Sequence, residues 1–291
     1  DYNDDTLAQT SGMVVQHNMN AINAMPANVA NGNGGAISNN YVTISDVVTP
    51  AELSVSGSEF SGNTARNYGG AIDNTAIAYI TNSTFTANKQ TNSNYGGGAL
   101  SNRADANYTG VMTITGGTFS NNTSVMRGGA IYNAGDLTVT GVTFSGNSAD
   151  HSGGAIYNTG VATIIDSTFT SNTSTRGGAL FNEGDKTLTV RAATKDSVFT
   201  GNNEDIQNRG TLNLQAVEGQ NITFNGTVTN TSGTTNIGGT YDDNGTTKTY
   251  DGTVNFNNAV TQNGVNLNSG TIHLGGVNNI LSGVTTFTVN G

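Results

Sequence analysis

The chain has 291 residues, of which 34% are hydrophobic and 10% charged, and it contains no cysteine and no tryptophan. Its formal net charge is −10 and it has no basic run, so binding to nucleic acid or to anionic lipid is not expected. No stretch approaches the roughly 18 consecutive apolar residues that identify a membrane-spanning helix.

Residues 1–33 precede the first repeat. Val15, Met19 and Ile22 fall at helical spacing, and Pro26 follows them. An open stack of strands must cover its terminal edge, and terminal repeats of solenoids are atypical for this reason. We therefore expect an N-terminal cap, in part helical, or alternatively an irregular first coil.

A two-part motif recurs from residue 34 onward. Its first part, Gly-Gly-Ala-[Ile/Leu]-x-Asn, occupies residues 34–39, 69–74, 97–102, 128–133, 153–158 and 177–182, with a decayed copy at 205–208. Its second part, Phe-x-x-Asn, begins at Phe60, Phe85, Phe119, Phe144, Phe169 and Phe199. Recurrence of a motif at a spacing near ~25 residues is typical of stacked repeats.

Residue types within one repeat indicate strands and tight turns. Apolar and polar residues alternate through Leu137 and Val139, which is the pattern of a half-buried strand. The glycine pairs permit turn conformations and close backbone approach. About 25 residues at ~3.3 Å each give a perimeter near ~80 Å, enough for three short faces. We predict an all-β fold, a single-stranded parallel β-helix of about ten coils of roughly 25 residues.

Stacking places like residues on like. Phe144 should lie between Phe119 and Phe169, and Asn133, Asn158 and Asn182 should form a ladder of side-chain amides. Regular coils are expected over 34–210. Residues 211–291 lose the motif but keep the strand pattern, so we expect irregular coils of the same β-helix, truncated at the C-terminus.

Extra residues fall on one side of the predicted coil, around 40–51, 103–110 and 184–196. Insertions on one face of a solenoid are often its binding face. The alternative is that loops vary in length wherever packing permits.

One surface feature predicts ligand contact. The x position of the first motif is Tyr132, Tyr157 and Phe181 in successive coils. If the preceding Ile or Leu points inward, these aromatic side chains point outward and stack, and exposed aromatic residues often contact proteins or sugars. The alternative is a ladder that only stabilises the fold.

Catalytic chemistry has little support in the sequence. His17, His151 and His273 are far apart and match no metal-binding spacing, and His151 is expected in an exposed turn. Carboxylates that parallel β-helical enzymes use would have to share a repeat position, which Asp136, Asp166 and Glu183 do not. We expect no enzyme activity, no cofactor and no metal. The alternative is a β-helical polysaccharide lyase or hydrolase.

The pairing of GGA[I/L] with FxxN resembles the repeats of chlamydial polymorphic membrane proteins, whose passengers are type V autotransporters; the likeness covers about 34–208. The segments 253–259 and 268–274 look like parts of self-associating autotransporter adhesins of Gram-negative bacteria. This resemblance implies a right-handed β-helical passenger on the outer membrane or outside the cell. Chlamydial members usually carry several cysteines, so their absence here favours a relative outside that group.

The expected function is therefore that of a surface-displayed adhesin. The expected partner is a host cell-surface or matrix protein or glycan, or another copy of the same chain in bacterial aggregation. The signal peptide and the C-terminal translocator barrel that the resemblance implies would lie outside this chain. We therefore expect the chain to be part of a longer protein that meets the membrane only through that barrel.

Overall fold

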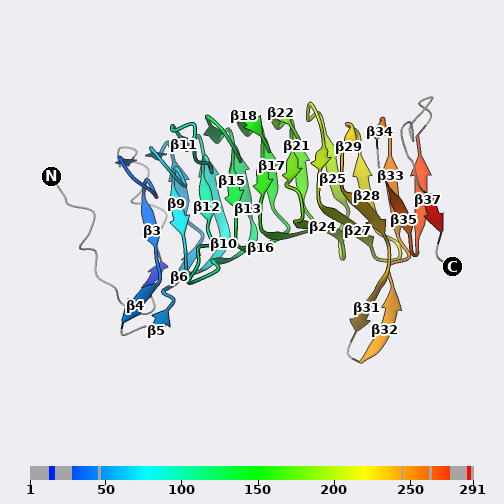
Figure 1. The fold of residues 1–291 in the computed structure, drawn as a ribbon, viewed down its shortest axis with the longest axis horizontal. Helices are drawn as coiled ribbons and strands as arrows, with labels where there is room; N and C mark the ends of the chain where they lie inside the picture. Colours follow the sequence, from blue (N-terminus) through cyan, green and yellow to red (C-terminus); the bar gives the residue numbers. More distant parts are fainter. Residues whose placement is uncertain are drawn as a thin grey trace.

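The computed structural model describes residues 13–16, 28–44, 47–243, 245–261, 264–275 and 287–289. Within these ranges all regular secondary structure is β-strand, and the coils stack along one long axis (Figure 1). Over the same ranges there is no helix of the length and hydropathy needed to cross a membrane. The prediction of an all-β parallel β-helix is confirmed; the number of coils and the right-handed sense remain predictions.

Three parallel sheets form the faces of the solenoid. Sheet A contains β1 (Met13–Gln16), β6 (Glu52–Ser56), β7 (Glu59–Ser61), β10 (Ile77–Thr86), β13 (Val111–Ser120), β16 (Asp136–Thr140), β17 (Thr143–Ser145), β20 (Val161–Ile165), β21 (Thr168–Thr170), β24 (Thr187–Ala192), β25 (Ser197–Thr200), β27 (Thr211–Ala216), β28 (Asn221–Phe224), β30 (Thr234–Ile237), β33 (Thr253–Phe256), β35 (Val265–Leu267), β36 (Thr271–Leu274) and β37 (Phe287–Val289). Sheet B contains β2 (Val29–Ala30), β8 (Thr64–Ala65), β11 (Lys89–Gln90), β14 (Thr123–Ser124), β18 (Ser148–Ser152) and β22 (Thr173–Arg176). Sheet C contains β3 (Ile37–Asn39), β9 (Ile72–Asn74), β12 (Leu100–Asn102), β15 (Ile131–Asn133), β19 (Ile156–Asn158), β23 (Leu180–Asn182), β26 (Ile206–Asn208), β29 (Val228–Asn230) and β34 (Val260–Thr261).

A column of phenylalanines fills the interior beside sheet A. Phe144 pairs in register with Phe119 and Phe169, and its ring centroid lies 5.1 Å and 4.8 Å from theirs. The predicted stack is confirmed. The column also continues through Phe199, Phe224 and Phe256, beyond the last full copy of the motif.

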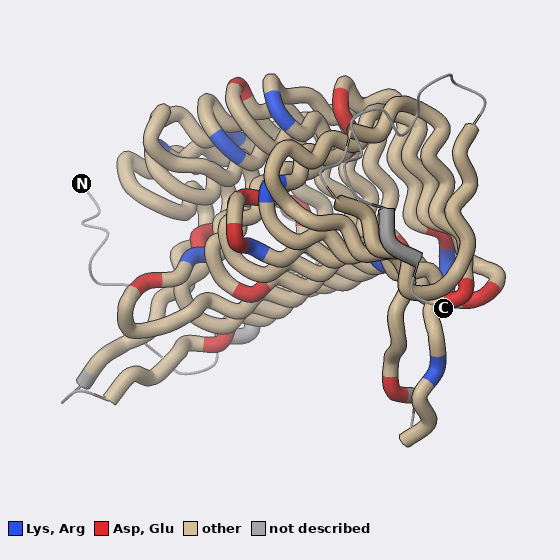
Figure 2. Tube along the Cα trace, turned by 45° about the vertical axis from the view of Figure 1, so that its right-hand side comes forward, with Lys and Arg blue, Asp and Glu red and all other residues tan. Residues whose placement is uncertain are grey.

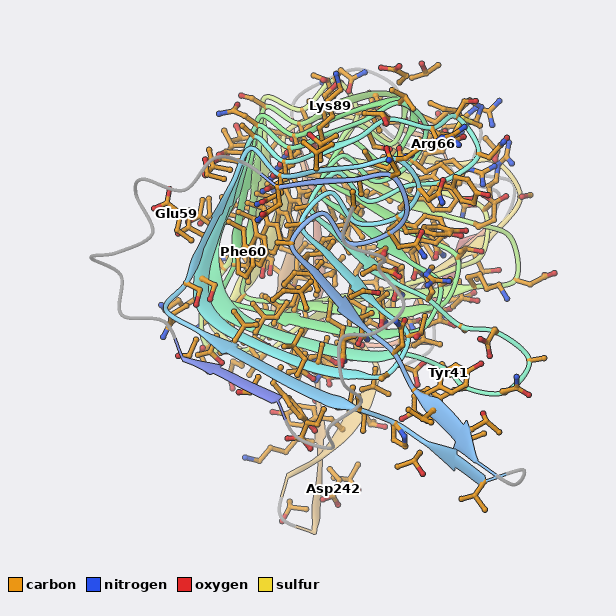
Figure 3. All side chains as sticks on the ribbon, turned by 90° about the vertical axis from the view of Figure 1, so that its left-hand side faces the viewer. Tyr41, Glu59, Phe60, Arg66, Lys89 and Asp242 are labelled. Carbon is orange, nitrogen blue, oxygen red and sulfur yellow. The ribbon has the colours of Figure 1, made fainter. Side chains whose placement is uncertain are left out.

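Side chains alternate across each strand, as the half-buried pattern predicts. Phe60 points into the interior while Glu59, its neighbour in β7, points outward (Figure 3). Ile131 and Ile156 are fully buried on the inner face of sheet C. The apolar core is therefore a thin column that runs the length of the solenoid, which explains how a chain with so few hydrophobic residues can fold.

Two ladders of buried asparagine side chains run along two corners of the coil. At the corner between sheets C and A, Asn133 Nδ2 donates to Asn158 Oδ1 and Asn158 Nδ2 to Asn182 Oδ1, each at 2.8 Å. The predicted ladder is confirmed, and it extends from Asn39 to Asn208. At the corner between sheets A and B, the FxxN asparagines form the second ladder, from Asn63 to Asn202, and the exposed Asn28 donates to its first member.

The two glycines of each pair meet different requirements. Gly153 has a φ of +67°, in the left-handed region that favours glycine. Gly154 has no such angle, but a Cβ on it would lie 2.1 Å from the Gly178 carbonyl oxygen of the next coil. The first glycine therefore turns the chain, and the second allows neighbouring coils to approach.

Two antiparallel hairpins depart from the coil. One is formed by β4 (Val42–Ile44) and β5 (Val47–Thr49), and the other by β31 (Thr240–Asp243) and β32 (Thr246–Thr249). Both stand out from the lower side of the solenoid in Figures 1 and 3.

The predicted insertions do not all fall at one corner. Residues 40–51 and 103–110 both lie between sheets C and A. In the third interval, β24 interrupts residues 184–196 and pairs in register with β20, so the extra residues lie on both sides of it. The part near 193–196 follows β24 at the bend within sheet A. Because β24 must keep its pairing with β20, the extra residues can be placed only before or after this strand.

The N-terminal segment contributes a strand to the solenoid. Val15, which the helical spacing included, lies in β1, and β1 pairs in parallel with β6. Pairing with an open sheet edge satisfies the backbone of this segment, which explains why a strand forms there. Met19 and Ile22 lie outside the described residues. Toward the other end, parallel pairing continues past residue 210 through β27, β28, β30 and β33.

Candidate functional site

The outer face of sheet C carries the aromatic residues that the sequence selects. Tyr132, Tyr157 and Phe181 occupy the central positions of β15, β19 and β23 and pair in register. Their ring centroids are 5.6 Å and 5.4 Å apart, and each pair is stacked. The predicted stacking of these three side chains is confirmed.

Their predicted exposure is wrong. Tyr157 is 5% exposed and Phe181 only 1%, while Tyr132 is half-buried. The physical reason is that arginines cover the rings: the Arg127 guanidinium lies 5.2 Å from the Tyr157 centroid and that of Arg209 lies 5.6 Å from Phe181. A ligand approaching this face would first meet guanidinium groups.

Two tyrosines that sequence reasoning missed extend this row of rings through tilted and edge-on contacts. Tyr68 lies 5.5 Å from Tyr132 and 4.8 Å from Tyr95, between ring centroids. We call Tyr95, Tyr68, Tyr132, Tyr157 and Phe181 the aromatic column. The signal for Tyr68 and Tyr95 was their position directly before a run of glycines. That position leads into sheet C, so its side chains can reach the face of that sheet.

A buried ion pair anchors the N-terminal end of the aromatic column. Asp73 is fully buried, and Arg103 donates to its two oxygens at 2.8 Å and 2.6 Å, while Ser101 also donates to it. The same guanidinium lies 4.8 Å from the Tyr68 centroid. Because an unpaired buried carboxylate is costly, the donors of Arg103 serve the fold.

Glu183 links two members at the other end. Its carboxylate accepts a hydrogen bond from the Tyr157 hydroxyl at 2.9 Å and lies 3.5 Å from Arg209. Burial, followed by the bond to Glu183, raises the pKa of Tyr157. Burial raises the pKa of Tyr132 to about 12, so both phenols stay neutral at physiological pH.

Arg127 and Arg176 differ from Arg103 and Arg209 in having no ion pair among the described residues. Ser152 separates them in register, and the Ser152 hydroxyl lies 2.8 Å from Nδ1 of His151. His151 belongs to β18 and is half-buried, where an exposed turn had been predicted. Burial, followed by the charges of Arg176, Arg127 and Arg209, lowers the pKa of His151.

These arginines stand out against the rest of the chain. Charged residues are sparse over the solenoid (Figure 2). Four of the six arginines, namely Arg103, Arg127, Arg176 and Arg209, lie on or beside the outer face of sheet C. The face therefore combines stacked aromatic rings with positive charge on a chain whose net charge is −10.

A second cluster joins two of the predicted insertions. Tyr41, beside the β4–β5 hairpin, packs 5.8 Å from Tyr108 between ring centroids, and its hydroxyl donates to Asp105 at 2.7 Å. The Asp105 carboxylate also accepts the backbone N–H groups of Asn107 and Tyr108. The two backbone bonds are local turn contacts that shape the 103–110 loop, and the Tyr41 bond ties that loop to the segment beside the β4–β5 hairpin.

The remaining sequence candidates do not converge. His273 is exposed in β36, and His17 lies outside the described residues. Asp136 begins β16, Asp166 turns sheet A with a φ of +51°, and Glu183 follows β23. In the part of the chain that the structure describes, no group of three acidic or histidine side chains could hold a metal ion.

Comparison with known proteins shows a match to a family model. The model of the Chlamydia polymorphic membrane protein repeat matches residues 57–75, 116–134, 141–159 and 166–183. No curated protein and no solved structure gives a significant match. Each matched segment runs from the bend in sheet A through one core phenylalanine to the end of a strand of sheet C, and so includes one asparagine of each ladder. The chain therefore contains four copies of the Chlamydia polymorphic membrane protein repeat.

Proposed function

We propose that this chain is part of a surface-displayed passenger of a Gram-negative autotransporter and acts as an adhesin rather than an enzyme. The observation that carries the proposal is the repeat itself, which recurs four times and supplies both asparagine ladders of a parallel β-helix. The repeat is named after polymorphic membrane proteins of Chlamydia, which supports a location at the outer membrane or cell surface.

The architecture supports a binding role. A solenoid presents long continuous faces, and such extended surfaces are what repeat proteins use to hold partners. The aromatic column and its arginines lie on one of these faces, and the β4–β5 hairpin and the 103–110 loop stand beside it. The partner is a host cell-surface or matrix component, or a second copy of the chain.

Display on a non-adherent bacterium tests the proposal. Cells carrying the chain should bind host cells or matrix, or aggregate, while cells carrying the display scaffold alone should do neither. Mixing labelled carriers with unlabelled scaffold cells separates the two modes, because self-association recruits only carriers. Equal adhesion of carrier and scaffold cells would contradict the proposal, as would new reducing or unsaturated sugar ends released from polysaccharide.

A further inference from the structure

Two arginines that have no ion-pair partner among the residues that the structure describes stand in one column at the corner between sheets B and C. Arg127, Ser152 and Arg176 occupy the position before the glycine pair in three consecutive coils and are paired in register. Neighbouring coils lie ~4.8 Å apart, so the backbones of the two arginines are about 10 Å apart along the long axis of the solenoid.

The Arg127 guanidinium is ordered before any ligand arrives. It lies over the Tyr157 ring, and Tyr157 is in turn fixed by its hydrogen bond to Glu183. Stacking occupies the flat face of a guanidinium and leaves its N–H edge free to donate. Arg103 uses that edge on Asp73 and Arg209 directs its own toward Glu183. An already ordered donor loses little entropy when it binds.

The pKa of His151 indicates that this corner is positively charged. This pKa is lowered, first by burial and then by Arg176, Arg127 and Arg209, while Glu183 acts in the opposite direction. Guanidinium groups from three coils therefore act on one imidazole. An anionic group that binds between Arg127 and Arg176 would relieve their mutual repulsion and accept hydrogen bonds from both.

The surroundings select the class of ligand. The large exposed hydrophobic side chains of the described residues are Val29, Val47, Tyr79, Val161 and Leu274, and none lies in β18, β19, β22 or β23. Protein interfaces need apolar anchors, and single-stranded nucleic acid needs open aromatic faces on which bases stack. Tyr157 and Phe181 are covered. Two charged donors spaced along a straight axis, one of them already ordered, fit a linear polymer that carries repeated acidic groups.

We propose that Arg127 and Arg176, with His151 beside them, bind the carboxylate or sulfate groups of an anionic polysaccharide lying along the solenoid. Ser152 lies between the two arginines in register but is 1% exposed, so it sets their spacing and does not contact the ligand. This proposal rests on the adhesive function and names the chemistry of what the adhesin holds. It also moves ligand contact from the predicted rings of Tyr132, Tyr157 and Phe181 to the arginines above them.

Calorimetry with the purified chain tests the site. Heparin supplies sulfate and carboxylate groups, hyaluronate supplies carboxylate alone, and dextran is neutral. Heparin should bind, and dextran should not. Binding of heparin alone assigns a sulfate ligand, and binding of both acidic polymers assigns a carboxylate. Affinity should fall as salt rises.

Matched variants locate the binding. The double variant R127Q/R176Q should weaken binding about tenfold or more, because it removes both charged donors to the anion. Arg66→Gln removes an exposed arginine next to β8 and should leave the affinity unchanged. Equal circular dichroism of all three proteins shows that the fold is intact.

Histidine titration by NMR gives a second readout. A bound anion should raise the pKa of His151 in the wild-type chain and leave it unchanged in the double variant. The site is overturned if the double variant binds as well as wild type, if neither acidic polymer binds, or if an oligonucleotide binds more tightly through the same arginines. Cell adhesion that persists in the double variant would contradict this site and leave the adhesive function standing. Polysaccharide binding without cell adhesion would contradict the adhesive function and leave the site standing.

Discussion

Asparagine suits the corner between sheets A and B because its amide both donates and accepts. Asn147 Oδ1 accepts from the backbone N–H and the Nδ2 of Asn122, and Asn147 Nδ2 donates to the Phe119 carbonyl and to Asn172 Oδ1. Every hydrogen-bonding position of the buried amide is used, which is the condition for burying a polar group without a large cost.

The ladder between sheets A and B ends on Asp205, whose carboxylate accepts hydrogen bonds and donates none. Asn202 Nδ2 donates to Asp205 Oδ1 at 2.9 Å, and the Gly226 N–H donates to Asp205 Oδ2 at 2.6 Å. Asp205 stands where the full copies of the motif have alanine. The decayed copy of the motif is therefore the place where the ladder is terminated.

The fully buried Asp205 predicts a pH dependence of stability. Burial raises the pKa of its carboxyl to about 6, from 3.8. Between pH 4 and 6 the folded chain holds a proton that the unfolded chain has lost, so the free energy of unfolding falls as pH rises through this window and then levels off. The total loss is at most about 3 kcal/mol.

Denaturant titrations between pH 4 and 7 check this dependence. Asp205→Asn keeps an acceptor for Asn202 and removes the titrating group, so its slope across the window should be flatter than that of wild type. Burial also raises the pKa of Glu204, which adds a contribution of the same sign to both proteins. An unchanged slope in the variant would mean that Asp205 is not responsible.

The phenylalanine column predicts how much free energy of unfolding the loss of one ring costs. Phe144 is fully buried between two stacked neighbours, so Phe144→Ala should lower the free energy of unfolding by about 3–5 kcal/mol. Tyr79→Ala is the matched control, because Tyr79 is 43% exposed on an outer face and its loss should cost little. Chemical denaturation measures both; a loss below about 1 kcal/mol for Phe144→Ala would contradict the buried stack.

At the scale of elements, the glycine pair makes the turn from sheet B to sheet C. Gly154→Ala would place a Cβ 2.1 Å from the Gly178 carbonyl oxygen and 2.5 Å from that of Thr173. Both obstacles are backbone atoms in the next coil, which cannot move without breaking the parallel ladder. We expect Gly154→Ala to destabilise the chain by several kcal/mol or to prevent folding.

Gly141→Ala provides the comparison. Gly141 has a φ of +65°, but no atom lies within 4 Å of a Cβ placed there. Only the strain of a left-handed alanine applies, and it costs about 1–2 kcal/mol. Thermal unfolding of the two variants separates close approach from backbone strain. Equal melting temperatures would show that coil spacing adjusts at Gly154.

The rings of the aromatic column are covered by side chains from other segments of the chain. Arg127 comes from the segment between β14 and β15, yet it covers Tyr157 of β19 in the following coil. Arg209 follows β26 and covers Phe181 of β23. A side chain at a coil corner can reach along the axis because neighbouring coils are so close. Exposure of a position on sheet C is therefore decided by residues one coil away.

At the scale of the whole molecule, strand pairing and both asparagine ladders join each coil to its neighbours, while Tyr41 and Tyr68 reach Asp105 and Tyr132 two coils away. Strand pairing and both ladders repeat the same contacts step by step, so stability accumulates along the axis as in other solenoids. This arrangement tolerates irregularity at the corners. The β31–β32 hairpin leaves the coil between β30 and β33, yet β33 still pairs in register with β28.

Periodicity alone made much of this fold predictable. Phe119, Phe144 and Phe169, and likewise Asn133, Asn158 and Asn182, recur every 24 or 25 residues, and a parallel stack is the arrangement that places each on its equivalent. The pattern also placed Tyr132, Tyr157 and Phe181 in one stacked column. It could not place 184–196, because an interval between motifs does not show where a strand such as β24 lies within it.

The sequence by itself determined the register, the core and three members of the aromatic column (Tyr132, Tyr157 and Phe181), because these follow from equivalent residues one coil apart. Only the tertiary structure decided what the surface offers. Arg127 and Arg209 stand outside the motif, and their reach over Tyr157 and Phe181 depends on side-chain direction at the corners. Asp205 likewise terminates a ladder that exists only once the coils are stacked. The repeat specifies which equivalent residues stack on one another. The burial of the aromatic rings and the charge of the outer face of sheet C depend on residues that do not repeat.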